Sequence, residues 1–302
     1  MEKTRNIDVI IIGGSYAGLS AAMALGRSLR KVLILDGGSR CNRQTPHAYN
    51  FLTQDGEEPR TIAQKAKAEV LKYSTVSWKD DLAISASKLE DGFSITTATG
   101  EVFSADKLLF ATGIKDIMPE ISGFEACWGI SVVHCPYCHG YEIRQQPTAI
   151  LANGARAVHL AKLVSNLTKD LTLLTMGRAD FTKEEMAKFN EHGIRIIERK
   201  VTALVHKAGQ LEKVQFDDGS LQEFRAVYAA VPFLQHTPLP EILGCSFTDT
   251  GLLEIDAFQQ TTVPGVYACG DNSSMLRSIA NAVYSGNLAG AMLNKVLIDE
   301  RF

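Results

Sequence analysis

The 302-residue sequence predicts an α/β protein built from two doubly wound, three-layer domains. Three observations carry this prediction: a strand–helix–strand pattern near the N-terminus, a second copy of it mid-chain, and a hydrophobic content of 45%. A single core stops growing near this chain length, so two cores are expected. We expect residues 1–115 and 245–302 to form one discontinuous domain, with residues 116–244 inserted as the second.

The first strand–helix–strand pattern covers residues 8–36. It begins with a continuous apolar run at residues 8–12, which is typical of a strand buried on both faces. The glycine-rich sequence GGSYAG, an Ala/Leu-rich helix and a second apolar strand at residues 32–35 follow. This order is typical of a Rossmann-like unit.

The rest of the first domain contains four further elements. Pro59 stands at a favourable first helical position, and residues 59–73 continue with strong helix formers. Short alternating stretches over residues 84–102 predict a small antiparallel meander, and residues 107–113 return as a buried strand. The chain ends in a helix over residues 279–297, whose Ala and Gly positions would allow close packing on another backbone.

The second copy of the pattern comprises a strand at 149–151, a helix at 155–167 and a strand at 171–175. It lies 139 residues (152 − 13) after the first, which indicates an internal duplication. This offset pairs Gly13 with Ala152, Ser15 with Gly154, Gly18 with Ala157, and Ala22 with Ala161.

The inserted domain continues with a helix opened by Thr182, where Thr182 and Glu185 have capping-box spacing. Strands are expected at residues 194–197 and 227–231.

A dinucleotide site is predicted at the first glycine motif. Gly13, Ser15 and Gly18 have the spacing of G-x-G-x-x-G, with serine at the middle position. Small residues there let backbone N–H groups and a helix N-terminus approach a pyrophosphate. Asp36, at the end of the second strand, can accept hydrogen bonds from an adenosine ribose.

Charge and composition exclude several function classes. The net charge of −3 is too balanced for the counterion-release binding of a nucleic-acid protein. The N-terminal apolar run before the glycine pair, Val9 to Ile12, is too short for a signal peptide or a membrane span. We therefore expect a cytoplasmic protein without nucleic-acid or membrane partners.

Cys135 and Cys138 form a C-x-x-C pair, for which three chemistries compete. Zinc needs four ligands, and the sequence has no second such pair, so no metal site is expected. Covalent haem matches C-x-x-C-H literally, but that attachment normally requires export. A redox-active dithiol is therefore favoured. The remaining cysteines are interpreted as core residues: Cys41, Cys127, Cys245 and Cys269.

Two later segments indicate which dinucleotide is bound. Ala111-Thr112-Gly113 and Gly270-Asp271 resemble the second and third flavin-binding segments of two-domain disulfide reductases. With the dithiol in the inserted domain, nearly the whole chain resembles the low-molecular-weight thioredoxin reductase family. The resemblance implies noncovalent FAD, a homodimer, and a thioredoxin-like protein or a small dithiol or disulfide as substrate. It also implies that Cys138 faces the flavin and that Cys135 exchanges with the substrate.

The expected FAD contacts come from all parts of the first domain. They are Gly13, Ser15, Gly18, Asp36, Asn42, Asn50, Thr112, Gly113, Gly270, Asp271 and Ser278.

The sequence departs from the family after the second cysteine. Typical thioredoxin reductases have an acid there as proton donor, whereas this chain has His139. Histidine titrates near neutrality and could serve as acid or base to the thiol, and a passive loop histidine is the alternative.

The second dinucleotide motif departs further. Ala152 replaces its first glycine, and Thr175 stands where the ribose-binding acid is expected. Arg178 alone remains of the arginines that would bind the NADPH 2′-phosphate, and Val231-Pro232 replaces a later glycine. These departures predict that NADPH binding is weakened or abandoned.

His139, the altered nucleotide motif and the segment 44–56 resemble the branch of gliotoxin and holomycin dithiol oxidases. Members of that branch pass electrons from a small dithiol through the cysteine pair to FAD and then to oxygen. Two function classes stay open. One is a FAD-dependent disulfide oxidoreductase, acting as a thioredoxin reductase or as a dithiol oxidase that uses oxygen or a ferredoxin-type partner. The other is a non-enzymatic flavin redox sensor.

Overall fold

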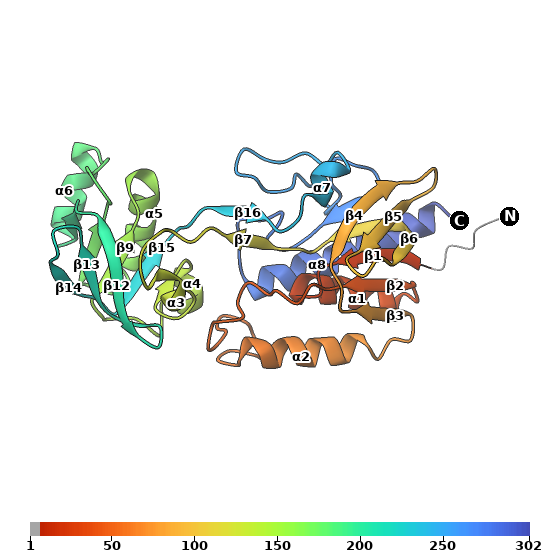
Figure 1. The fold of residues 1–302 in the computed structure, drawn as a ribbon, viewed down its shortest axis with the longest axis horizontal. Coiled ribbons are helices and arrows are strands. Elements are labelled where there is room, and N and C mark those ends of the chain that lie inside the picture. Colours follow the sequence, from red (N-terminus) through yellow and green to blue (C-terminus); the bar gives the residue numbers. More distant parts are fainter. Residues whose placement is uncertain (1–6) are drawn as a thin grey trace. The chain divides into compact units, whose positions relative to one another are not determined.

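The computed structural model describes residues 7–302, and the chain divides into two compact units. Unit 1 holds the described residues up to Arg43, with Arg60–Lys115 and Phe233–Phe302, and unit 2 holds Gln44–Pro59 and Asp116–Pro232. The two segments that join the units, β7 (Ile114–Asp116) and β16 (Phe233–Gln235), pair with each other (Figure 1). The first six residues of the expected 1–115 segment lie outside the described residues.

The boundaries of the units differ from those expected from the sequence. Unit 1 resumes at Phe233 rather than at residue 245, because Leu239 of the short helix α7 (Leu239–Ile242) is fully buried in the unit 1 core. Residues 44–59 group with unit 2, where the Gln44 and Thr45 side chains lie against the turn at Gly129.

Unit 1 is built on one sheet in the order β3-β2-β1-β6-β5-β4, with β17 pairing the end of β6. Two of its parallel strands contain continuous buried apolar runs, at residues 9–12 and 32–35, as expected for strands covered on both faces. The strands are β1 (Ile7–Ile12), β2 (Val32–Leu35), β3 (Val76–Lys79), β4 (Ala83–Lys88), β5 (Phe93–Thr97), β6 (Val102–Phe110) and β17 (Val266–Ala268).

The last part of the predicted meander and the predicted strand at 107–113 form one longer strand, β6. The first half of β6 pairs antiparallel with β5, and its second half pairs parallel with β17 on the same edge. Along its other edge β6 pairs parallel with β1. One strand therefore closes the meander and brings Ala111 to the carboxyl edge of the parallel strands.

Helices α1 (Tyr16–Arg27) and α8 (Ile279–Asp299) pack against each other in unit 1 (Figure 1). A Cβ built on Gly286 would overlap the carbonyl oxygen of Ala17, and one on Gly290 would lie 2.6 Å from the carbonyl oxygen of Ala21. The predicted close packing of the small-residue helix is thereby confirmed. Helix α2 (Pro59–Val70) ends three residues before the predicted limit of 73 (73 − 70).

Unit 2 has a parallel sheet in the order β11-β10-β9-β15-β8 and an antiparallel sheet, β12-β13-β14. The strands are β8 (Val132–Val133), β9 (Thr148–Leu151), β10 (Leu171–Leu174), β11 (Arg195–Ile197), β12 (Val201–Lys207), β13 (Gln210–Phe216), β14 (Leu221–Glu223) and β15 (Ala226–Ala229). The helices are α3 (Phe124–Cys127), α4 (Pro136–His139), α5 (Gly154–Val164) and α6 (Lys183–Glu191).

The two units repeat the same strand–helix–strand geometry. β2 and β10 begin at Val32 and Leu171, which gives the predicted offset of 139 residues (171 − 32). Each pairs parallel with the strand that precedes its helix. The predicted capping box at Thr182 and Glu185 opens α6 and is confirmed.

Neighbouring residues of the unit 2 strands supply two separate cores. Val227 packs on the side of the antiparallel sheet, and Tyr228 packs on the side of α5 and α6. Since strand side chains alternate between the two faces, the parallel sheet is the middle of three layers. The predicted three-layer α/β architecture is confirmed. Among residues 7–302, no helix is long and apolar enough to cross a membrane.

Candidate functional site

The first glycine motif forms a tight turn at the carboxyl ends of β1 and β6. Gly13 has φ of +107°, and a Cβ on it would overlap the carbonyl oxygen of Ala111. A Cβ on Gly18 would overlap the carbonyl oxygen of Gly13. Only glycine therefore lets α1 start this close to the strand, which exposes the backbone of the turn.

Asp36 and Ser15 complete this turn. The carboxylate Oδ1 of Asp36 accepts a hydrogen bond of 3.1 Å from the N–H of Gly14, which leaves Oδ2 for another donor. Ser15 is the N-cap of α1, but its side chain makes no capping hydrogen bond, and the first turn contains no acidic residue. The helix N-terminus therefore keeps its N–H groups and its positive end for an anion.

The second and third predicted segments reach the same edge of the sheet. The N–H of Gly270, after β17, donates to Ser285 Oγ, and a Cβ on Gly270 would lie 3.0 Å from Ala17 Cβ. Thr112 Oγ1 accepts from Asn272 Nδ2 at 3.3 Å. Gly113 has φ of +64° and faces open space. Three segments far apart in the sequence thus meet beside α1.

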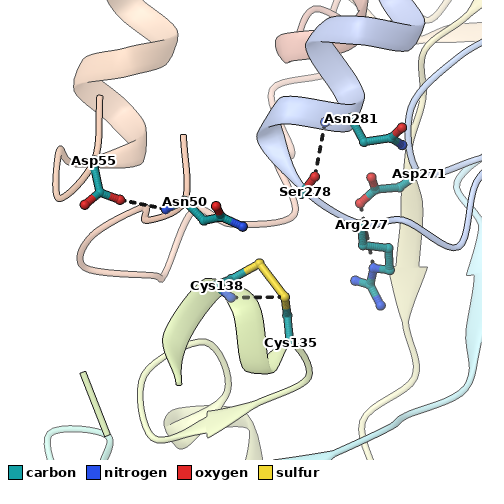
Figure 2. Close-up of a disulfide and its surroundings, with 8 residues drawn as sticks. All are labelled: Asn50, Asp55, Cys135, Cys138, Asp271, Arg277, Ser278 and Asn281. Carbon is teal, nitrogen blue, oxygen red and sulfur yellow. Dashed lines mark hydrogen bonds and ion pairs between the residues drawn. A yellow bond between two sulfur atoms is a disulfide. The ribbon is translucent and has the colours of Figure 1, made fainter. Parts of the chain in front are cut away.

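The remaining expected contacts of unit 1 lie around the start of α8. Ser278 is the N-cap of α8, and its Oγ accepts from the N–H of Asn281 at 3.1 Å. Asp271 Oδ2 lies 3.7 Å from Arg277 Nε, and both contacts are drawn in Figure 2. Asn42 donates from Nδ2 to the hydroxyl of Tyr16 at 3.4 Å.

The geometry of unit 1 fits an adenine dinucleotide. The glycine turn and the free end of α1 suit a pyrophosphate, and the carboxylate of Asp36 suits ribose hydroxyls. Asn272 is fully buried, and its Oδ1 has no hydrogen-bond partner among the described residues. A buried acceptor of this kind is costly unless something donates to it. These residues could hold a cofactor at the carboxyl edge of the sheet.

The dithiol is held at the short helix α4 of unit 2. Cys135 and Cys138 are joined by a disulfide with a Cα–Cα distance of 5.3 Å (Figure 2). Cys135 is the N-cap of α4, and its Sγ accepts a 3.2 Å hydrogen bond from the N–H of Cys138. Pro136 at the first helical position fixes the turn that brings the two cysteines together. Both cysteines are partly exposed, so a substrate thiol could reach the pair.

His139 is the last residue of α4, directly after the second cysteine. Burial lowers the pKa of His139 from its usual value of 6.5 to about 4, because the apolar surroundings disfavour the charged imidazolium. The imidazole is therefore neutral at pH 7.

Asn50 lies in a loop of unit 2 that its own hydrogen bonds close. The N–H of Asn50, which has φ of +58°, donates to Asp55 Oδ1 at 2.7 Å (Figure 2). Ala48 and Glu57 form a bridge at the base of the loop. The structure thus places Asn50, Cys135, Cys138 and His139 in unit 2 and the other expected site residues in unit 1.

The second glycine motif has a different local structure from the first. Asn153, the N-cap of α5, accepts at Oδ1 from the N–H groups of Gly154 and Asp180, each at 2.9 Å. Its Nδ2 donates to the carbonyl oxygens of Arg178, at 2.9 Å, and Thr175, at 3.4 Å. One amide therefore ties the start of α5 to the loop after β10. A Cβ on Gly154 would lie 3.3 Å from Asp180 Oδ2, so a carboxylate stands at this turn.

Thr175 occupies the position that Asp36 has in unit 1. It is buried, and its hydroxyl donates to the carbonyl oxygen of Gly177 at 2.6 Å. Glu198 Oε1 accepts from the N–H of Ala179 at 2.7 Å, which adds a second carboxylate to the loop after β10. Asn153 and Glu198 thus bond to the backbone of this loop, and the carboxylates of Asp180 and Glu198 would repel a phosphate.

The cysteines outside the pair fall into two groups. Burial raises the pKa values of the Cys127, Cys245 and Cys269 thiols, which keeps them protonated in the core. The core interpretation is confirmed for these three and is wrong for Cys41. Cys41 is only partly buried, because it lies in the loop after β2, where Arg277 Nη2 donates to its Sγ at 3.4 Å.

Several residues of the site were missed from the sequence. Gly14 has no room for a Cβ, which would overlap the Trp78 ring and lie 2.9 Å from Asp36 Cβ. The doubled glycine at 13–14 is the signal that could have identified it. Asn272, directly after the Gly-Asp pair, gave no signal because an isolated asparagine is more often a solvated turn residue.

Comparisons with known proteins agree with this geometry. The family model described as pyridine nucleotide-disulphide oxidoreductase matches residues 7–286. Thioredoxin reductase tcpT of Claviceps purpurea is 32% identical over 311 residues, which cover 99% of this chain and 96% of that protein. Thioredoxin reductase aclD of Aspergillus oryzae is 31% identical over 307 residues, which cover 97% and 98% of the two chains.

A solved structure shows the same likeness. A putative thioredoxin reductase from Bacillus anthracis superposes with a TM-score of 0.93 at 30% sequence identity, covering 98% of this chain and all of that one (100%). The predicted resemblance to thioredoxin reductases is confirmed, as is the prediction of a disulfide oxidoreductase enzyme.

Proposed function

Because this chain belongs to the pyridine nucleotide-disulphide oxidoreductase family, we propose that it is a FAD-dependent thiol–disulfide oxidoreductase that works without a nicotinamide nucleotide. Electrons pass between a thiol substrate and the flavin through Cys135 and Cys138. The hydrogen bonds that Asn153 makes to the start of α5 and to the loop after β10 are the observation that argues against a nicotinamide nucleotide.

The unit 1 residues bind and orient the cofactor in this proposal. The turn at Gly13 and Gly14 and the N-terminus of α1 hold the pyrophosphate, and Asp36 holds the adenosine ribose. Asn272 Oδ1, which has no partner among the described residues, would accept a hydrogen bond from the cofactor. FAD, when bound, supplies a two-electron acceptor for the reduced cysteine pair.

The cysteine pair carries the exchange with the substrate. A substrate thiolate attacks Cys135 Sγ, which forms a mixed disulfide and releases Cys138 as a thiolate. The second substrate thiol then displaces Cys135. The substrate dithiol has become a disulfide, and the enzyme pair has gained two electrons and two protons. His139, neutral at pH 7, takes a proton from the reacting thiol.

The loop around Asn153 disfavours a dinucleotide in unit 2. In unit 1, Ser15 makes no capping hydrogen bond, so the N-terminus of α1 is available to a ligand. In unit 2, Asn153 accepts a hydrogen bond from the N–H of Gly154 and donates one to the carbonyl oxygen of Arg178 in the loop after β10. Asp180 and Glu198 place negative charge where a 2′-phosphate would require arginine. Electrons therefore leave through oxygen or a ferredoxin-type partner. The substrate is a small dithiol or a thioredoxin-like protein, and the cytoplasmic location and the homodimer stay predictions.

The proton role of His139 predicts an unusual pH profile. Because the pKa of His139 lies at about 4, the imidazole is neutral over a range from about pH 5 to about pH 9. Dithiol-driven flavin reduction should follow the thiolate fraction of the dithiol. No further inflection should appear near the ordinary histidine value of 6.5, and an additional loss of rate should appear only as the pH falls towards 4 and the base is protonated. The rate of single-turnover flavin reduction, measured across this range, checks the profile.

Replacing His139 separates a proton acceptor from a passive loop residue. His139→Ala should slow flavin reduction by about 10²-fold at pH 7. The matched control, His159→Ala, removes an exposed imidazole from α5 and should leave the rate unchanged. Full activity of His139→Ala would eliminate the proposed proton role.

Aerobic turnover tests the proposed function directly. Purified holoenzyme is mixed with dithiothreitol or with reduced thioredoxin, and thiol loss and oxygen consumption are followed together. We expect thiol-dependent oxygen uptake without added nucleotide. Disulfide reduction that requires NADPH would instead identify a thioredoxin reductase, and no turnover with any thiol would identify a flavin redox sensor.

A further inference from the structure

Tyr228 places a hydroxyl without a hydrogen-bond partner in the core of unit 2, next to the segment that carries the dithiol. Its side chain is 1% exposed and packs on the face of the unit 2 sheet that carries α5. No described residue forms a hydrogen bond with the Tyr228 hydroxyl. A buried hydroxyl without a partner destabilises the state that contains it, so native structures rarely retain one without a role.

The C-terminal end of the turn that carries the dithiol adjoins this hydroxyl. A Cβ on Gly140, the C-cap of α4, would lie 3.2 Å from the Tyr228 hydroxyl oxygen and would overlap the carbonyl oxygen of Pro136. Tyr228 also pairs in the sheet with Val133, two residues before Cys135 (135 − 133). The segments before and after the cysteine pair therefore both adjoin Tyr228.

The disulfide limits how this turn can move. It holds Cys135 and Cys138 at a Cα–Cα distance of 5.3 Å, and the N–H of Cys138 bonds to Cys135 Sγ and to the Cys135 carbonyl oxygen. Reduction breaks the Sγ–Sγ bond and removes this constraint from a helix of four residues. Tyr228 itself is fixed by its core packing, so the turn is the part that can adjust.

The hydroxyl remains protonated throughout. Burial, with a smaller contribution from the negative charge of Glu142, raises the pKa of Tyr228 above its usual value. Tyr228 therefore interacts as a neutral hydroxyl that can donate to a carbonyl oxygen or a sulfur of the turn, and it takes no part in proton transfer.

We propose that Tyr228 is a positioning residue that favours the open dithiol: its hydroxyl lacks a partner in the disulfide form and gains one from the dithiol turn on reduction. This inference rests on the proposed thiol–disulfide function. In the step itself the Sγ–Sγ bond gains two electrons and two protons, and these come from a dithiol that is oxidised to its own disulfide. Tyr228 changes the equilibrium of this exchange and not its stoichiometry.

The exchange equilibrium of the Tyr228→Phe variant tests the proposal. Holoenzyme is equilibrated anaerobically in buffers of reduced and oxidised dithiothreitol, and free thiols are alkylated and counted by mass spectrometry. Removing the unpaired hydroxyl stabilises the disulfide form, which no longer buries a polar group without a partner. It destabilises the dithiol form, which loses the hydrogen bond. We expect the equilibrium to move towards the disulfide by about tenfold.

A matched control is available in unit 1. Tyr267 is also 1% exposed, but its hydroxyl has a partner, Gln260 Oε1, at 3.4 Å. Tyr267→Phe should leave the equilibrium of the cysteine pair unchanged. Thermal unfolding supplies the second readout, because Tyr228→Phe should raise the unfolding temperature of the oxidised form relative to that of the reduced form.

The outcomes distinguish the role of Tyr228 from the proposed thiol–disulfide function. A wild-type pair that never titrates with dithiothreitol would overturn both. A wild-type pair that titrates, with an unchanged equilibrium in Tyr228→Phe, would overturn the role of Tyr228 alone. Equal shifts of unfolding temperature in the two redox forms would likewise reduce Tyr228 to a structural residue.

Discussion

Cys138→Ser should retain bound FAD and lose dithiol-driven flavin reduction by roughly 10³-fold or more. Cys138 is the cysteine that the family resemblance places next to the flavin, and serine cannot form the disulfide through which electrons pass. All expected cofactor residues except Asn50 lie in unit 1, whereas the pair lies in unit 2, so we expect the substitution to leave FAD bound. Anaerobic stopped-flow absorbance with dithiothreitol measures the loss.

Cys245→Ser is the matched control for this substitution. Cys245 is buried in the unit 1 core and contacts Thr261 Oγ1 through its sulfur at 3.5 Å, a contact that a serine hydroxyl can replace. The control should reduce its flavin at the wild-type rate. A Cys138→Ser variant that keeps that rate would show that the thiol reduces the flavin without the pair.

Gly18→Ala should lower the affinity for FAD by roughly 100-fold, since overpacking costs about 1–3 kcal/mol and a factor of ten corresponds to about 1.4 kcal/mol. The added methyl group would overlap the carbonyl oxygen of Gly13. Because that oxygen belongs to the backbone of the turn, α1 must shift and carry its N–H groups away from the pyrophosphate. Flavin content after purification and titration of the apoprotein with FAD measure the change.

The duplicated unit supplies the control for Gly18→Ala. Ala157, fully buried in α5, stands at the equivalent position of unit 2. Ala157→Gly should leave flavin content unchanged, although it weakens a helix by up to about 1 kcal/mol. Wild-type FAD affinity in Gly18→Ala would contradict the assignment of this turn to the pyrophosphate.

Local patterns in the sequence predicted much of the fold. The duplication is visible because buried parallel strands and small helix residues recur at a fixed offset, and β2 and β10 keep that offset. The capping box at Thr182 depends on residues three positions apart, so it is readable without tertiary information. The Ala and Gly positions of the last helix predicted close packing on another backbone, and the structure shows Gly286 and Gly290 of α8 in that role against α1, a partner that the sequence did not identify.

The parts that escaped prediction depend on contacts between distant segments. Asn153 looks like an ordinary loop residue, and its role follows only from bonds to Thr175, Arg178 and Asp180, which are 22 to 27 residues away. In the sequence, Tyr228 resembles the other buried residues of its strand. Its unpaired hydroxyl and its proximity to Gly140, the C-cap of α4, are visible only in the tertiary structure. The return to unit 1 at Phe233 was missed because the burial of Leu239 is a tertiary property.

In the proposed function, thiols and not nicotinamide nucleotides exchange electrons with the flavin. Anaerobic stopped-flow absorbance at about 450 nm follows the oxidised flavin after the holoenzyme is mixed separately with NADPH, NADH and dithiothreitol. We expect only the dithiol to bleach this band and oxygen to restore it. Rapid bleaching by micromolar NADPH would contradict the proposed nucleotide-independent function, because the loop closed by Asn153 would then admit the nucleotide.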